Sequence, residues 1–131
     1  MLVEFMKLSK EMKKARKPFL KELELIEYLA NKANYQLSLN WKEKLVVFPL
    51  TKDKIGPLKL KQETITSSDK SHCREISNCM FYDKDGVGVA AYLLVDEDDH
   101  ICELDMWKGD DSIILEIPSM NKMLDIPVID S

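Results

Sequence analysis

The stretch of residues 75–108 constrains the fold more than any other part of the chain. It reads EISNCMFYDKDGVGVAAYLLVDEDDHICELDMWK, and apolar and polar residues alternate over three runs that two Asp-rich turns separate. Alternation with a period of two is typical of strands with one buried face. The Asp-Gly pair at 85–86 supplies the backbone conformations that a tight hairpin needs. The stretch therefore predicts a meander of antiparallel strands.

The second turn predicts the register of the last two strands of this meander. If Val95 lies opposite His100, one face of both strands is largely apolar and should be buried. The other pairs on that face are Leu93 with Cys102, Ala91 with Leu104, and Val89 with Met106. The opposite face pairs Tyr92 with Glu103, Ala90 with Asp105, and Gly88 with Trp107. The first strand is expected to add Met80 and Tyr82 to the apolar face, and Cys79 and Phe81 to the opposite one.

Two helices are predicted before the meander. Apolar residues recur every three or four positions over residues 2–15 and again over residues 19–33, which is typical of helices with one buried face. Pro18 separates the two, because the residue before a proline avoids the helical region. We expect the 19–33 helix to cover the sheet and the 2–15 helix to be appended. The connection that follows should bury Leu37, Leu39 and Trp41.

The remaining apolar segments predict further strands. LVVFPL at residues 45–50 should be an edge strand or a strand end, because Pro49 cannot donate a hydrogen bond to a neighbouring strand. Residues 58–60 should pair back on it, IILEI at 113–117 should form a last strand, and the polar residues 62–74 should form a loop. The expected fold is therefore α+β, with an antiparallel sheet of about four to six strands packed against one helix.

Composition bounds the number of domains. The chain has 131 residues, of which 45% are hydrophobic and 32% charged, as in ordinary globular domains. This length is enough for one core and not for two. We expect a single domain over residues 18–118, with a helical extension at 1–17 and a tail at 119–131. No run of about 18 apolar residues occurs, and the first residues lack the pattern of a secretory signal, so we expect neither a membrane segment nor export.

The cysteines predict unpaired thiols. Cys73, Cys79 and Cys102 are odd in number and lack C-x-x-C spacing, which favours buried or free thiols in a reducing, cytoplasmic setting. A structural zinc site needs about four ligands. The scattered cysteines and the two histidines, His72 and His100, do not offer that spacing. We therefore expect no metal and no cofactor.

Charge is distributed unevenly along the chain. Residues 1–17 carry six basic and two acidic side chains, whereas residues 83–131 carry thirteen acidic and three basic ones. The formal net charge is -4. Proteins that bind nucleic acid usually show a clear basic footprint, and the lysines near the start are spread around their predicted helix. We expect no nucleic-acid partner, and an acidic back half that favours basic partners.

Three segments carry a family resemblance. They are FLKELELIEYLANKAN, LVVFPLTKDKIGPLKL, and YDKDGVGVAAYLLVDEDDHICELDMWKGDDS followed by ILEIP. From about Lys17 to Pro118 the chain resembles a family of small, uncharacterised bacterial domains with a D-x-D-G turn, an alternating strand and an E-L-D-x-W-K segment. The chain departs from that pattern at Leu20, where members usually have a Thr or Ser cap, and in TKDKIGP, where they have more glycine. The resemblance implies an α+β fold and no established activity.

The sharpest candidate site lies at the end of the meander. Glu103 and Asp105 are two residues apart on a predicted strand, so both carboxylates project to one side, where they could share a proton, hold a cation or grip a basic residue. Trp107 beside them offers the flat apolar area of an interface anchor, unless it simply packs over Gly88. The full set of candidate partner-binding residues is Asp96, Asp98, Asp99, Glu103, Asp105, Trp107, Lys108, Asp110 and Asp111.

Three function classes remain open at this point. The leading hypothesis is a small cytoplasmic bacterial protein-binding domain whose acidic surface contacts a basic protein. Some small bacterial proteins of similar build are immunity proteins to secreted toxins, which is an analogy at the level of fold and size. The second class is an enzyme or small-ligand binder that uses Glu103 and Asp105 beside Trp107, although no catalytic residue is assigned. The third is a homo-oligomer, such as a homodimer joined through the terminal extensions.

Overall fold

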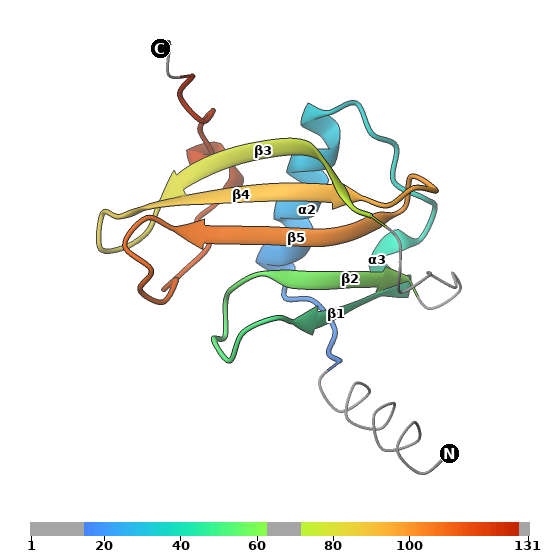
Figure 1. Ribbon diagram of the computed structural model, residues 1–131, viewed down its shortest axis with the longest axis horizontal. Helices are drawn as coiled ribbons and strands as arrows, with labels where there is room; N and C mark the ends of the chain where they lie inside the picture. Colours follow the sequence, from blue (N-terminus) through green and yellow to red (C-terminus); the bar gives the residue numbers. More distant parts are fainter. Residues whose placement is uncertain (1–14, 63–71, 129–131) are drawn as a thin grey trace.

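The computed structural model describes residues 15–62 and 72–128 of the chain (Figure 1). Five strands form one antiparallel sheet in the order β1-β2-β5-β4-β3. They are β1 (Leu45–Pro49), β2 (Leu58–Gln62), β3 (Arg74–Tyr82), β4 (Gly88–Val95) and β5 (Ile101–Lys108). The helical elements are α2 (Leu20–Lys32), the short α3 (Trp41–Lys44) and the 3-10 helix η1 (Met120–Lys122). The predicted α+β architecture is confirmed, while the predicted 2–15 helix lies outside the described residues apart from position 15.

The core lies between α2 and the sheet face that this helix covers. Leu25, Ile26 and Leu29 of the helix are fully buried, and α2 packs on β3 and β4. The sheet contributes Leu45, Val47, Leu58, Leu60, Cys79, Phe81, Val89, Ala91, Leu93, Val95, Ile101, Leu104 and Met106. Burial of each large apolar side chain contributes roughly 1.5–3 kcal/mol. Figure 1 shows the opposite sheet face toward the viewer, and no described helix crosses it.

Helix α2 begins without a Ser or Thr cap, as expected, and the Glu22 side chain caps its N-terminus instead. The Glu22 side chain is fully buried and accepts a hydrogen bond from the Phe19 N–H at 2.8 Å. It also accepts two hydrogen bonds from the Arg16 guanidinium, at 2.8 and 2.9 Å. A carboxylate at this position satisfies a free N–H of the first turn and suits the positive end of the helix dipole.

Within the described residues, no helix is long and apolar enough to cross a bilayer.

The connection after α2 departs from the prediction at one residue. Trp41 is buried and begins α3, but Leu39 is 84% exposed. Asn40 has a left-handed backbone with φ 62°, which turns the chain into α3 between these two residues. Asn adopts this conformation more readily than most residues do.

The β3–β4 turn determines which side chains of β3 face the core, and the predicted assignment of faces for this strand is wrong. The Asp83 N–H donates to the Val87 carbonyl at 2.9 Å, so three residues form the loop, and Gly86 at its third position has φ 83°. A change of one residue in a loop exchanges the two faces of a strand. As a result, Cys79 and Phe81 are fully buried under α2. Tyr82, which was expected in the core, is 59% exposed, and Met80 shares its face.

The β4–β5 register also differs from the prediction. Beside the turn, Val95 pairs with Ile101, but Leu94 already pairs with Glu103, so Cys102 is an extra residue that forms a bulge. The remaining pairs are Leu93 with Leu104, Tyr92 with Asp105, Ala91 with Met106, Ala90 with Trp107, and Val89 with Lys108. The predicted pairing of Leu93 with Cys102 is therefore wrong by two residues. A shift of two keeps each side chain on its face, which is why Leu104 and Met106 are buried as expected.

The cysteines differ from the prediction as well. Cys73 and Cys102 form a disulfide, whereas Cys79 is a free, buried thiol. Cys73 precedes β3 and Cys102 is the bulge residue of β5, so the bridge joins the two neighbours of β4. Burial raises the pKa of the Cys79 thiol to about 11. The expectation of unpaired thiols is wrong for Cys73 and Cys102, and the cytoplasmic location drawn from it stays a prediction.

Segments from both ends of the described chain each bridge one residue of an edge strand. In β1, the predicted edge strand, Val47 exchanges two backbone hydrogen bonds with Arg16, at 3.0 and 2.9 Å. In β3, Met80 exchanges two with Leu124, both at 2.8 Å. Residues 113–117 do not form the predicted strand. An exposed edge strand is a template for unwanted pairing, and these bridges occupy an interior residue of each edge.

Candidate functional site: an acidic groove beside Trp107

A buried ion pair fixes the end of β5. Lys108 Nζ lies 2.9 Å from Asp83 Oδ2, and both side chains are almost wholly buried. The same ammonium donates to Asp85 Oδ2 at 2.6 Å and to the Ile113 carbonyl at 2.9 Å. Asp83 also accepts backbone hydrogen bonds from Lys84, Leu115 and Glu116, at 2.8, 2.7 and 3.1 Å. The pair therefore ties the β3–β4 turn, the end of β5 and the segment after it into one cluster, the Asp83–Lys108 cluster.

The hydrogen bonds of this cluster keep both groups charged at neutral pH. Burial alone would raise the pKa of Asp83, but the hydrogen bonds from the Leu115 N–H and the Lys108 ammonium hold it below its usual 3.8. Burial alone would lower the pKa of Lys108, but the carboxylates of Asp85 and Asp83 hold it above its usual 10.5. Because the Lys108 side chain is 2% exposed and its ammonium has three acceptors inside the protein, Lys108 does not belong to the candidate site.

The outward side of β5 carries the residues that the sequence singled out. Glu103, Asp105 and Trp107 alternate with the buried Leu104 and Met106, so all three lie on the face away from α2. Glu103 is paired across the sheet with Lys59 on β2. Partial burial, and then the nearby Asp105 carboxylate, raise the pKa of Glu103, while Lys59 opposes that rise. The predicted same-side placement of the two carboxylates is confirmed.

Trp107 is available for contact at the end of this row. Its side chain is 59% exposed, and its cross-strand neighbour is Ala90 rather than the predicted Gly88. The indole Nε1 donates to Asp111 Oδ1 at 2.8 Å, which fixes the ring against the turn that follows β5. Asp111 has φ 60°, a left-handed backbone that Asp tolerates, and this turn returns its carboxylate toward the ring. The result is an oriented aromatic side chain on the protein surface.

A groove of about 340 Å³ lies beside Trp107, and we call it the acidic groove. It lies where the β1–β2 loop meets the turn after β5. The described residues that line it are Thr51, Asp53, Ile55, Gly56, Pro57, Asp105, Met106, Trp107, Lys108, Asp111, Ser112 and Ile114. Three of these are aspartates, and the lysine among them is already paired with Asp83 and Asp85. The groove can therefore hold a cationic group between carboxylates and an aromatic ring.

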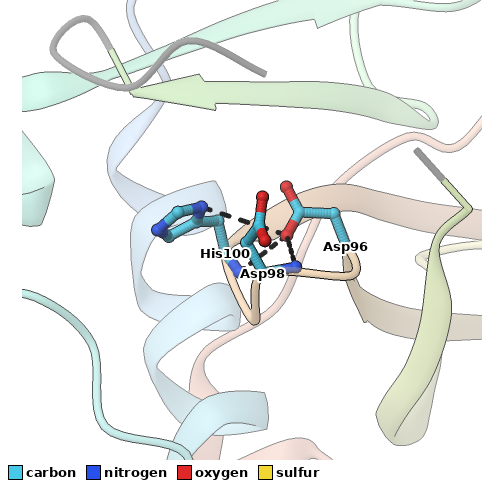
Figure 2. Close-up of side chains that lie close together, drawn as sticks. All are labelled: Asp96, Asp98 and His100. Atoms are coloured by element: carbon cyan, nitrogen blue, oxygen red, sulfur yellow. Dashed lines mark hydrogen bonds and ion pairs between the residues drawn. The ribbon is translucent and has the colours of Figure 1, made fainter. Parts of the chain in front are cut away.

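The acids of the β4–β5 turn lie elsewhere. Figure 1 shows this turn at the opposite end of the sheet from the β1–β2 loop. Asp99 pairs with Arg74 at 2.7 Å, and Asp96, Asp98 and His100 place their ligand atoms within 4.8 Å of one another (Figure 2). However, Asp96 Oδ1 already accepts the Asp98 and His100 N–H groups at 2.9 and 3.0 Å. These contacts close the turn itself, so the group is an Asp-rich turn rather than a built cation site.

The structure therefore divides the candidate set. Asp105, Trp107 and Asp111 meet in the acidic groove, whereas Asp96, Asp98 and Asp99 belong to the opposite end and Glu103 lies along the face between them. Asp110 closes its own turn, since its carboxylate accepts hydrogen bonds from Ser112 Oγ at 2.6 Å and from the Ser112 N–H at 3.0 Å. Those hydrogen bonds lower the pKa of Asp110.

Sequence reasoning missed the other wall of the groove. Asp53, with Thr51, Ile55 and Pro57, comes from the β1–β2 loop, which is some fifty residues away in the chain. The loop is closed by a hydrogen bond from the Leu50 N–H to the Pro57 carbonyl at 3.0 Å. The only signal in the sequence was an acid in a turn, TKDKIGP, and such turns are usually solvated. The pairing of β2 with β5 is what brings the loop beside Trp107.

Comparison of the sequence with known protein families gives a match. A family model for a domain of unknown function, DUF6984, matches residues 15–118. This range holds α2 and all five strands, and with them the groove-lining residues. No curated protein and no solved structure matches the chain.

Proposed function

The chain belongs to the DUF6984 family, whose function is unknown, and on that premise we propose that it is a binding module that holds a basic protein partner in the acidic groove. The observation that carries this proposal is the composition of the groove. Asp53, Asp105 and Asp111 line it together, and no unpaired cation is among its described lining residues. A Lys or Arg side chain of a partner would gain charge-assisted hydrogen bonds there.

Trp107 supplies the apolar part of the same contact. Tryptophan is among the side chains that are enriched at the energetic hot spots of protein interfaces. A guanidinium stacked on its face while bonded to Asp105 or Asp111 would combine a cation–π contact with a salt bridge. Because the groove is open, a partner can reach it without opening the domain. These features suit a protein partner better than a small molecule, which needs a more enclosed pocket.

Affinity capture with matched baits tests the proposal. Full-length protein should retain a basic partner from extracts of the source organism, and retention should fall as salt is raised, because charge steers the contact. The double substitution Asp105→Asn with Asp111→Asn should weaken that binding about tenfold, since each exposed pair is worth up to about 1 kcal/mol. Trp107→Ala should weaken it by more, about thirtyfold for a 2 kcal/mol anchor.

The opposite turn supplies the control for this experiment. Asp98→Asn combined with Glu97→Gln removes two negative charges at the other end of the sheet, so it changes net charge equally without touching the groove. Partner binding should stay within about twofold of the native value. If this control weakens capture as much as the groove variant does, only net charge matters and the groove is not the site.

A further inference from the structure

A second groove lies next to the acidic one, and its charge is opposite. It has a volume of about 260 Å³ and we call it the basic groove. The described residues that line it are Phe19, Lys21, Lys54, Ile55, Lys84, Leu115, Glu116 and Ile117. Three lysines face a single glutamate, so its charge is positive. Apolar atoms of Phe19 and Leu115, which are 38% and 46% exposed, add apolar surface to it.

The lysines of the basic groove are only loosely held. Lys84 lies 3.4 Å from Glu116, and both side chains are more than half exposed. Lys21 lies 3.4 Å from Glu24 on the helix, and Lys54 Nζ is 5.8 Å from the centre of the Phe19 ring. Exposed contacts of this kind contribute little and exchange readily. The ammonium groups can therefore turn to an anionic group of a ligand at small cost.

One loop separates the two grooves and gives each a charge. Ile55 of the β1–β2 loop lines both grooves. The residues just before it are divided between them, since Asp53 lines the acidic groove and Lys54 lines the basic one. Consecutive residues of opposite sign thus face opposite sides of the same loop. The two grooves therefore adjoin at Ile55 and carry opposite charge.

We propose that the basic groove binds an acidic side chain of the same partner segment whose basic side chain occupies the acidic groove. This inference rests on the proposed function and specifies its partner: a polypeptide segment with a basic and an acidic residue a few positions apart. A ligand of uniform charge would be repelled by one of the two grooves, whereas a dipolar segment is attracted by both. Charge arranged in this way fixes the direction in which a segment binds.

Peptide binding followed by NMR tests this inference. The chain has two tryptophans, and the exposed Trp107 indole N–H, which donates to Asp111, reports on the acidic groove while buried Trp41 serves as an internal reference. The probes are capped peptides with Arg and Glu separated by one to four glycines, and matched peptides in which Gln replaces Glu. The best Arg–Glu peptide should bind about threefold to tenfold tighter than its Arg–Gln partner.

Two substitutions locate the source of that gain. In Lys54→Gln with Lys84→Gln, both replaced side chains are exposed, so the fold should be kept, as the remaining amide signals would verify. The Arg–Glu and Arg–Gln peptides should then bind equally, and the affinity for the Arg–Gln peptide should not fall. A gain that persists in this variant would overturn the inference, because the glutamate would be bound elsewhere.

The outcomes separate this inference from the function on which it rests. Equal binding of Arg–Glu and Arg–Gln peptides to the native protein would overturn the inference and leave the acidic groove as a site. Failure of every peptide to shift the Trp107 signal would overturn both. Inorganic phosphate is titrated in parallel, and tighter binding of phosphate than of the best peptide would show a site for free anions and overturn the dipolar segment.

Discussion

The two hairpin turns of the meander have the same local structure and opposite roles. In each, the first Asp closes a three-residue loop, with N–H to carbonyl distances of 2.9 Å from Asp83 to Val87 and 2.8 Å from Asp96 to His100. The third loop residue is left-handed in both, with φ 83° at Gly86 and φ 62° at Asp99. Both first aspartates are 5% exposed. Backbone geometry and burial therefore do not distinguish the turns.

What distinguishes them is where the buried carboxylate finds its donors. Asp96 accepts hydrogen bonds from Asp98 and His100, which belong to its own turn. Asp83 accepts one from its neighbour Lys84, and the others from Lys108 and from the segment at 115–116, which are 25 to 33 residues away. One carboxylate shapes a turn, while the other holds three separate segments together. A buried acid can thus be a local or a global element of the same fold.

The largest effect is expected from Asp83→Ala. Removal of one partner leaves the Lys108 ammonium buried and only partly compensated, and deprives three backbone N–H groups of their acceptor. Breaking a buried pair in this way costs about 3–5 kcal/mol of unfolding free energy. Urea denaturation followed by tryptophan fluorescence would measure this loss. A loss below about 1 kcal/mol would mean that Asp85 and Ile113 alone suffice for Lys108.

The same substitution predicts a pH dependence. Because the folded protein holds the pKa of Asp83 below its usual 3.8, the stability that this group contributes is present above that value and is lost as pH falls through the folded pKa. Lys108 has a raised pKa, so its contribution is present below 10.5 and is lost as pH rises through the folded value. The difference in unfolding free energy between native protein and Asp83→Ala should therefore shrink toward both extremes. A difference that is constant from acid to alkali would exclude the ion pair as its cause.

A smaller effect is expected from Asp96→Ala. This substitution deprives two N–H groups of their acceptor, but both groups lie in an exposed turn that water can reach. A loss of about 1–2 kcal/mol is expected, consistent with one or two neutral hydrogen-bond partners. Hydrogen exchange should show faster opening of the β4–β5 turn without faster exchange at Leu115 and Glu116. Faster exchange at Leu115 and Glu116 as well would show that Asp96, like Asp83, stabilises the whole fold, which would contradict the proposed difference between the two turns.

The smallest effects are expected at the left-handed positions. Gly86→Ala should cost about 1 kcal/mol, because an L-residue resists this backbone, while a Cβ there would meet nothing within 4 Å. Asp99→Gly should change stability by less than about 0.5 kcal/mol, since relief of the backbone offsets the loss of the exposed pair with Arg74. Thermal unfolding of the two variants would test both predicted changes in stability. A larger loss at Asp99 than at Gly86 would show that the Arg74 contact matters more than the backbone.

The sequence was informative where a pattern is local. The alternation in β4 and the helical spacing of α2 predicted elements that are confirmed, as are the edge strand at β1 and its hairpin with β2. The same-side placement of Glu103 and Asp105 is also confirmed, because it needs only the strand period.

The sequence was not informative where one residue decides a register or where distant residues meet. One residue in the β3–β4 loop exchanges the two faces of β3 relative to the prediction. The bulge at Cys102 changes the pairing of β5 with β4 by two residues. Lys108 is buried where it meets Asp83 and Asp85, more than twenty residues earlier, and the disulfide joins Cys102 to Cys73, 29 residues earlier. One wall of the groove comes from a loop that the pairing of β2 with β5 places beside Trp107. The DKDG turn at residues 83–86 and Lys108 meet in the Asp83–Lys108 cluster, although they are more than twenty residues apart in the chain.

The bridges from Arg16 to Val47 and from Leu124 to Met80 have a consequence for assembly. A strand from another protein could pair along β1 or β3 only after it displaced the segment of this chain that is bound at that edge. Encounters with other proteins are thereby directed to side chains, whose identity and charge differ from one protein to the next, rather than to the amide groups that every polypeptide shares. The same arrangement opposes growth of the sheet from molecule to molecule into fibrils.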